Sequence, residues 1–233
     1  MLEVHWPELD ARLGLHFEVP KYSPPSSQAS DTRDDPLTTQ PDLSNTSKIK
    51  VIYLGNSMLE RLKTTGTSTN LGRLAESGTV WNAGCGGDKT ENVNFRLSDK
   101  GDGMYLPLEQ HGHVKLWVIV SGTNNLPPKK PFRAAEAEAY RLLLQACVRI
   151  APKSKVIACD MFYRKDIPDA ILDESNAMLK TVVQETNQTV SGHMREEKQC
   201  ITDGPIQWLE ARTKIGKKLL VDQVHLIEEG YAK

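Results

Sequence analysis

Residues 114–122, VKLWVIVSG, decide the fold class of this chain. Apart from Lys115, the stretch is apolar up to its last two residues, whereas a strand with one face in water would alternate apolar and polar side chains. Continuous apolar strands are typical of parallel sheets that carry helices on both faces. The stretch therefore predicts a buried strand in such a sheet.

The segments on either side of this strand alternate between strand and helix patterns. Further short apolar runs predict strands at 50–54 (KVIYL), 79–84 (TVWNAG), 155–161 (KVIACDM) and, as a last strand, 199–203 (QCITD). Helical patterns follow at 57–63, 90–97, 133–150 and 172–187. In the second of these, we expect Val93, Phe95 and Leu97 to lie partly on one side. The alternation predicts an α/β domain with a mostly parallel sheet covered on both faces.

The beginning of the chain has a different composition. Residues 23–47 hold almost no large apolar side chains, which predicts a disordered linker because such a segment cannot bury enough surface to offset its ordering. Residues 1–22 contain Trp6 and several leucines and are expected to form a short helix or arm. We therefore predict two parts: a flexible N-terminal extension at 1–48 and a folded domain at 49–233.

Charge and composition exclude several classes of function. The net charge of −1 leaves no electrostatic footprint for nucleic acid. No apolar stretch is long enough to span a membrane, and the N-terminus lacks the basic start and apolar core of a signal peptide. The four cysteines are scattered without metal or disulfide spacing, and Cys147 and Cys159 lie in apolar runs typical of buried thiols. These features predict a reduced, cytoplasmic protein without a metal site.

A glycine-rich stretch, WNAGCGGDKTENVNFRL at 81–97, raises the question of a phosphate-binding loop. A P-loop would need glycine at positions 83 and 88, where this chain has Ala83 and Asp88. The dinucleotide fingerprint fails as well, because Lys89 occupies its third glycine position. The stretch is therefore interpreted as a loop rich in backbone N–H groups that stabilises a negative charge other than a phosphate.

Residues with a polar side chain or a free backbone N–H follow three of the predicted strands, where sites form in open parallel sheets. Ser57 follows the first strand, Gly87 the second and Asn124 the third, while Asp222 and His225 lie three residues apart near the C-terminus. One helical turn or a tight loop would place the last two on the same side. Taken singly, Ser57 could be a helix N-cap, the glycine loop a tight turn, and the acid and imidazole a surface pair.

Together these residues suit one chemistry. A serine hydroxyl needs a base within hydrogen-bond reach, and His225 can be that base while Asp222 fixes its tautomer. Attack on an ester carbonyl creates an oxyanion, to which the backbone N–H groups of Ser57 and Gly87 and the side-chain amide of Asn124 could donate. Ser57 is not in a G-x-S-x-G elbow, which argues against the common α/β-hydrolase arrangement.

The same residues carry a family resemblance. GNSM at 55–58, GCGGDKTENVNFRL at 84–97, VIVSGTNN at 118–125 and DQVHLIEEGYAK at 222–233 together resemble the four sequence blocks of the SGNH, or GDSL, hydrolases. They are most similar to the intracellular platelet-activating-factor acetylhydrolase catalytic subunits. The resemblance extends from about Lys50 to the end of the sequence.

The resemblance implies a three-layer α/β/α flavodoxin-like domain that cleaves a short-chain carboxylic ester, with acetyl the favoured acyl group, through an acyl-enzyme. It implies that Ser57 is the nucleophile, His225 the base and Asp222 its partner, with Ser57, Gly87 and Asn124 forming the oxyanion hole. No metal or organic cofactor is expected. The expected substrate is a small-molecule or lipid ester, and the resemblance allows a homodimer.

Two departures from the family pattern leave alternatives open. Asn56 stands where the family usually has aspartate, so an acceptor oxygen is kept but a charge is lost. The eight residues after His225 leave room for a helix of about two turns, which is short. One alternative is a catalytically weakened member of the fold that acts as a binding module. Another is a carbohydrate acetylesterase, which the fold also hosts.

Overall fold

The computed structural model describes residues 48–98, 103–111, 113–195 and 204–233, so the predicted extension at 1–48 lies almost wholly outside the described residues. The described residues form a five-stranded sheet in the order β2-β1-β3-β4-β5, and every neighbouring pair is parallel. The strands are β1 (Val51–Gly55), β2 (Val80–Gly84), β3 (Leu116–Val120), β4 (Lys155–Cys159) and β5 (Ile206–Leu209). This is the flavodoxin-like strand order, and it confirms the predicted α/β class.

The stretch that predicted the sheet forms its middle strand. In β3, Trp117 and Ile119 pack into the core on one face of the sheet, while Val118 and Val120 pack against the other. Trp117 is fully buried, and its indole N–H donates to the hydroxyl of Ser154 at 3.1 Å. The run is apolar throughout because neither face of this strand meets water.

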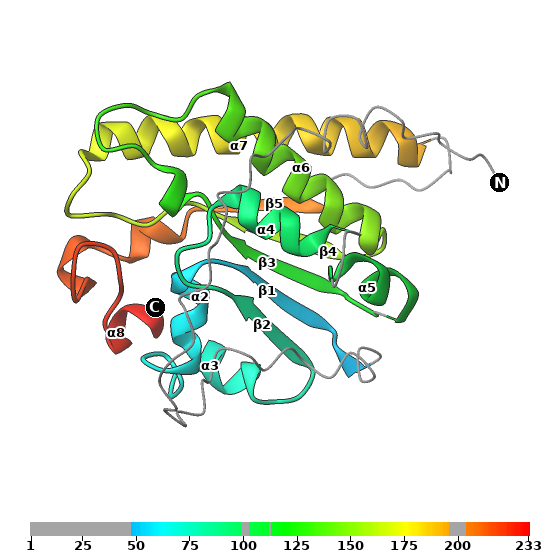
Figure 1. The fold of residues 1–233 in the computed structure, drawn as a ribbon, viewed down its shortest axis with the longest axis horizontal. Helices are drawn as coiled ribbons and strands as arrows, with labels where there is room; N and C mark the ends of the chain where they lie inside the picture. Colours follow the sequence, from blue (N-terminus) through cyan, green and yellow to red (C-terminus); the bar gives the residue numbers. More distant parts are fainter. Residues whose placement is uncertain (1–47, 99–102, 112, 196–203) are drawn as a thin grey trace, which may run out of the picture. The chain divides into compact units, whose positions relative to one another are not determined.

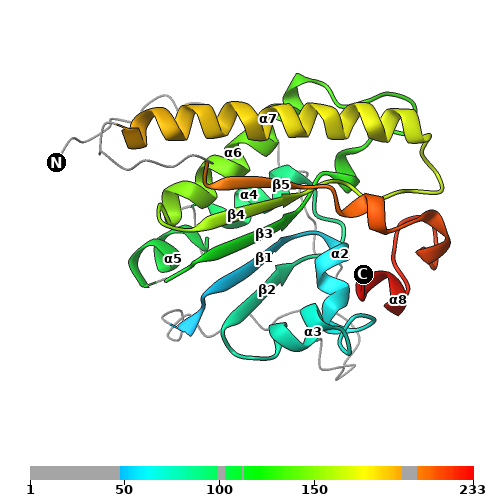
Figure 2. The same cartoon turned by 180° about the vertical axis from the view of Figure 1, so that it is seen from behind.

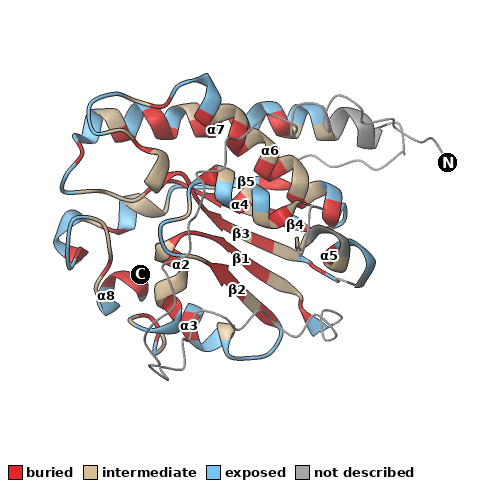
Figure 3. Cartoon of the chain, viewed as in Figure 1, coloured by how far each residue is buried: buried red, intermediate tan, exposed pale blue. Residues whose placement is uncertain are grey.

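Four helices cover one face of the sheet (Figure 1): α4 (Thr90–Leu97), α5 (Tyr105–His111), α6 (Ala134–Ile150) and α7 (Asp169–Arg195). Their inward residues are buried, whereas exposed residues line their outer sides (Figure 3). In α4, Val93 and Leu97 are buried, but Phe95 is 65% exposed. The prediction for Phe95 was wrong because residues two positions apart point to different sides of a helix, whereas Val93 and Leu97, four apart, share one.

Shorter elements cover the other face (Figure 2): α2 (Ser57–Glu60), η2 (Arg61–Lys63), α3 (Asn70–Ala75), η5 (Lys217–Leu219) and α8 (Glu228–Tyr231). Buried side chains from both ends of the described sequence share one core here, among them Leu59, Leu62, Leu219, Leu226 and Tyr231. Residues from the start and the end of the domain therefore pack together on this face. The helix after His225 has four residues, about half of the predicted two turns.

Some elements differ from the sequence prediction. The expected strand at 199–203 lies outside the described residues, and the fifth strand is Ile206–Leu209. The helices α3 and α5 were not predicted. The buried positions of Cys147 and Cys159 are confirmed. Among the described helices, none combines the length and the apolar character needed to cross a bilayer.

The order in which the chain connects the strands reverses within the sheet. The chain goes from β1 outward to β2 and then returns to β3 on the other side of β1, so β1 and β3 are neighbours at a topological switch point. Gly55, the last residue of β1, fits closely there: a Cβ on it would collide with the carbonyl oxygen of Val120. Ligands of open α/β sheets bind at such points, beyond the carboxyl ends of the strands.

Candidate active site

Ser57 is the first residue of α2, directly beyond the carboxyl end of β1. The helix cap is Asn56, not Ser57: the Asn56 Oδ1 accepts the Met58 N–H at 3.0 Å. This leaves the Ser57 hydroxyl available for other contacts. Asn56 is fully buried, and its Nδ2 has no hydrogen-bond partner among the described residues.

Asp222 and His225 are brought together by a tight loop, one of the two arrangements that their spacing predicted. The Asp222 Oδ1 accepts the backbone N–H groups of Val224 at 2.8 Å and His225 at 2.7 Å. The Oδ2 lies 2.7 Å from the Nδ1 of the His225 ring. A bond between the N–H of Val221 and the carbonyl of His225 closes the loop at 2.8 Å. The carboxylate thus fixes both the backbone and the ring of the histidine.

The other ring nitrogen of His225 faces the serine. Its Nε2 lies 3.0 Å from the Ser57 Oγ, although the two residues are 168 positions apart in the chain. With the Nδ1 proton directed to Asp222, the Nε2 is the acceptor for the serine hydroxyl. Ser57, His225 and Asp222 therefore form one hydrogen-bonded chain, as a nucleophile, base and orienting acid would.

The charge state of Asp222 suits this arrangement. Partial burial opposes its ionisation, but the hydrogen bonds from the His225 and Val224 N–H groups and from the His225 ring outweigh that effect and hold the pKa of its carboxyl well below the usual range. Arg61, one turn after Ser57, adds a positive charge with its Nη2 4.0 Å from the Asp222 Oδ2. Arg61 was missed in the sequence, since no motif linked it to residue 222.

Gly87 lies in the loop after β2, and its backbone has a φ of +79°, in the left-handed region that favours glycine. The loop is held to β1 by the N–H of Cys85, which donates to the Gly55 carbonyl at 3.1 Å. A turn follows in which the Asp88 N–H donates to the Cys85 carbonyl at 3.3 Å. No described residue accepts a hydrogen bond from the Gly87 N–H or the Ser57 N–H.

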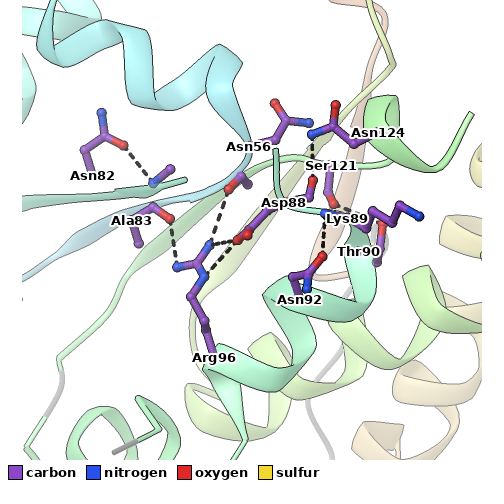
Figure 4. Close-up of polar contacts among 12 residues, drawn as sticks. Asn56, Asn82, Ala83, Asp88, Lys89, Thr90, Asn92, Arg96, Ser121 and Asn124 are labelled. Carbon is purple, nitrogen blue, oxygen red and sulfur yellow. Dashed lines mark hydrogen bonds and ion pairs between the residues drawn. The ribbon is translucent and has the colours of Figure 1, made fainter. Parts of the chain in front are cut away.

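An ion pair below this loop fixes it to the sheet (Figure 4). The Arg96 Nη2 lies 2.7 Å and its Nε 2.9 Å from the Asp88 Oδ2. The same guanidinium donates to the carbonyl of Ala83 at 3.0 Å and to that of Gly55 at 3.4 Å. No sequence motif pointed to Arg96. Asp88 could have indicated it, because a carboxylate in the glycine-rich loop, where a P-loop has glycine, needs a cation nearby.

Asn124 lies in the 3₁₀ turn η3 (Thr123–Asn125) after β3, which follows Gly122 at a φ of +105°. Its Nδ2 donates to the Asp88 carbonyl at 2.9 Å, as Figure 4 shows. An amide nitrogen carries two hydrogens, so one remains for another acceptor. This bond joins the loop of Asn124 to the loop of Gly87.

All five residues predicted for the site therefore lie in two connected groups. Direct contacts join Ser57, His225 and Asp222, and a hydrogen bond joins Asn124 to the residue after Gly87. Ser57, Gly87 and Asn124 follow the carboxyl ends of the paired strands β1, β2 and β3, so both groups lie at the same edge of the sheet. The described part of the chain holds no cluster of three or more His, Cys, Asp or Glu side chains suited to a metal ion.

Comparison with known proteins supports the fold at low sequence identity. No protein-family model and no curated protein sequence matches the chain. A family 3 carbohydrate esterase from Clostridium thermocellum is similar in structure, with a TM-score of 0.52 and 16% identity over 79% of this chain and 90% of that one. A carbohydrate esterase family 3 protein from Talaromyces cellulolyticus has a TM-score of 0.51 and 16% identity, over 78% of this chain and 90% of that one. A Streptococcus pneumonia protein whose name refers to platelet activating factor has a TM-score of 0.51 and 17% identity, over 79% of each chain.

Proposed function

We propose that the protein is a serine esterase that cleaves a short-chain carboxylic ester, with acetyl the favoured acyl group, through an acyl-enzyme. The observation that carries the proposal is the continuous chain from the Asp222 Oδ2 through both His225 ring nitrogens to the Ser57 Oγ, with links of 2.7 and 3.0 Å. Such a chain activates a hydroxyl that is otherwise a weak nucleophile. A surface pair of acid and imidazole would not need a serine at the second ring nitrogen.

Acylation begins when the Ser57 Oγ attacks the ester carbonyl carbon and gives its proton to the Nε2 of His225. Asp222 is ionised and stabilises the imidazolium that forms, without taking its proton. The tetrahedral intermediate then collapses. Its C–O bond to the alcohol breaks as His225 returns the proton to the leaving oxygen, which leaves an ester between Ser57 and the acyl group.

The negative oxygen of the intermediate needs donors at the switch point. The Ser57 N–H lies at the start of α2, and the Gly87 N–H and the second Asn124 amide hydrogen come from loops that are tied together. The Arg96–Asp88 pair holds the glycine loop before substrate arrives. Preorganised donors of this kind each contribute about 3–4 kcal/mol to the barrier reduction.

Deacylation repeats the cycle with water as the nucleophile. His225 removes a proton from the water, which attacks the acyl carbon, and then returns that proton to the Ser57 Oγ as the carboxylic acid leaves. The reaction needs no redox partner or added group. The products are one carboxylic acid and one alcohol.

The direct test is the hydrolysis of p-nitrophenyl acetate by the wild-type protein and by Ser57→Ala. We expect the wild type to release nitrophenolate and the variant to lose at least ~10³-fold in kcat, because the residual rate of triad variants comes only from the oxyanion donors and from substrate binding. Equal rates in the two proteins would refute a serine mechanism at this position.

A carbohydrate acetylesterase is the second candidate. It is favoured by the likeness to the two carbohydrate esterases of family 3, which shows a shared fold and leaves the substrate open. A panel of acetate esters separates the candidates: acetylated xylo-oligosaccharides, a 2-acetyl ether phospholipid and simple alkyl acetates. The class with the highest kcat/KM identifies the leaving group.

A further inference from the structure

We propose that Arg164 and Lys165, in the segment after β4, act as a clasp that fixes the histidine base relative to the oxyanion donor. Neither residue belongs to the site described above, and the inference rests on the proposed esterase function. The clasp joins two loops that lie far apart in the sequence, one carrying Asn124 and the other carrying Asp222 and His225. Both clasp residues are positioning residues.

Arg164 holds the loop of the oxyanion donor. Its Nη1 donates to the carbonyl of Thr123 at 2.9 Å, directly before Asn124. The rest of the guanidinium is fixed by Asp166, whose two oxygens accept from the Nε at 2.9 Å and from the Nη2 at 2.6 Å. The side chain is only 15% exposed. A two-bond fork of this kind restricts the guanidinium more than a single bond would.

Lys165 holds the loop of the base at two points. Its backbone N–H donates to the carbonyl of Gln223 at 2.8 Å, and its Nζ donates to the carbonyl of Leu220 at 2.9 Å. These two carbonyls lie on either side of Asp222 in the chain. The residue therefore restrains the short segment from which the triad acid and the histidine project.

The strand order explains why this segment can reach both loops. In the sheet, β4 lies between β3, which leads into the Asn124 loop, and β5, after which the chain continues toward His225. Because the two clasp residues are neighbours in sequence, both loops are hydrogen-bonded to the same short segment of the chain, which fixes their positions relative to each other. A displacement of a catalytic group by about 1 Å can cost roughly a hundredfold in rate, so such a common reference matters for catalysis.

The test uses Lys165→Met and Arg164→Met, which keep most of the side-chain stem and remove the polar head. Lys165→Met retains the backbone bond to Gln223, so we expect the fold to be preserved. On p-nitrophenyl acetate we expect each variant to lose about tenfold in kcat with KM within twofold, and Arg164→Lys to recover part of the loss. Lys153→Met is the matched control, since Lys153 is exposed at the amino end of β4. It should keep wild-type kcat.

Amide hydrogen exchange gives a readout that does not depend on catalysis. We expect Lys165→Met to speed exchange in residues 219–226 and Arg164→Met to speed it in 122–126, each sparing the other loop. Wild-type exchange in both variants overturns the clasp, and so does faster exchange with unchanged kcat. A wild-type protein that hydrolyses no ester refutes the proposed function instead, and exchange alone then decides whether the clasp holds the loops.

Discussion

At the scale of single residues, Gly87 is the position where the sequence and the structure agree most specifically on a role, that of a backbone N–H donor. The sequence singled it out as a backbone donor in a glycine-rich loop, and the structure gives it a φ of +79°. A Cβ on Gly87 would meet no atom within 4 Å, so a side chain there would strain the backbone without a collision. Gly78 provides a matched case, with a φ of +72° and equally open surroundings at the far end of β2.

We therefore expect Gly87→Val and Gly78→Val to lose similar stability, about 1–2 kcal/mol each, because both force an L-residue into the left-handed region. Their activities should differ. Gly87→Val should lose roughly a hundredfold in kcat, since relief of the backbone strain moves the N–H donor, and Gly78→Val should stay near wild type. Urea unfolding and ester hydrolysis measure the two effects. A folded Gly87→Val with wild-type kcat would remove Gly87 from the oxyanion hole.

At the scale of elements, Arg96 ties helix α4 to the ends of two strands. It lies in the last turn of α4, and its contacts reach Asp88, the carbonyl of Gly55 at the end of β1 and that of Ala83, one residue before the end of β2. The helix itself was predictable at 90–97 from its amphipathic pattern, and the structure has it at Thr90–Leu97. The ion pair was not, because it depends on how the helix axis lies over the strand ends, which periodicity does not determine.

Arg96→Met should lower the free energy of unfolding by about 1–3 kcal/mol, because it leaves a carboxylate that is 13% exposed without its partner. It should also lower kcat by loosening the glycine loop. Arg73→Met is the control: Arg73 lies on α3, where it donates to the exposed Asn70 side chain, and its loss should change stability by less than about 0.5 kcal/mol. Equal unfolding free energies for the two variants would show that the Asp88 pair contributes little.

At the scale of the whole molecule, the sequence determined the class of fold better than the assembly of the site. Apolar runs such as the one in β3 identify strands buried on both faces, but they do not say which strands are neighbours. The contact between Ser57 and His225 spans 168 positions, and it was suggested by the chemistry of the two side chains and by the resemblance to known hydrolase blocks, not by the pattern of strands and helices. The strand predicted at 199–203 lies outside the described residues, and the strand at Ile206–Leu209 was not predicted because this segment is short and only partly buried.

The free energy of unfolding of the whole domain should also depend on pH through a buried acid outside the site. Asp160 follows β4 and is 4% exposed, and burial raises the pKa of its carboxyl to about 6 although the Arg212 N–H donates to it at 3.0 Å. The unfolded chain ionises this group near pH 3.8, so the folded state binds its proton more tightly. This tighter proton binding stabilises the folded state fully below pH 3.8, and the stabilisation is lost as the pH rises to about 6.

We expect Asp160→Asn to remove this loss, which amounts to about 3 kcal/mol for a shift of two pH units. The difference in unfolding free energy between variant and wild type should therefore grow in favour of the variant from pH 4 to 6 and then stay constant. Comparing the two proteins at each pH cancels the carboxylates with lowered pKa, such as Asp166. Asp169→Asn serves as the exposed control. A pH-independent difference for Asp160→Asn would contradict the assignment.

The proposed esterase function depends on a nucleophilic Ser57, and labelling with a fluorophosphonate measures this most directly, whatever ester is the natural substrate. Intact-protein mass spectrometry should show one phosphonyl adduct per wild-type chain, none on Ser57→Ala, and labelling of His225→Ala slower by several orders of magnitude. Stoichiometric labelling would also exclude a module that only binds. No adduct on the folded wild-type chain, or equal labelling of Ser57→Ala, would contradict the account.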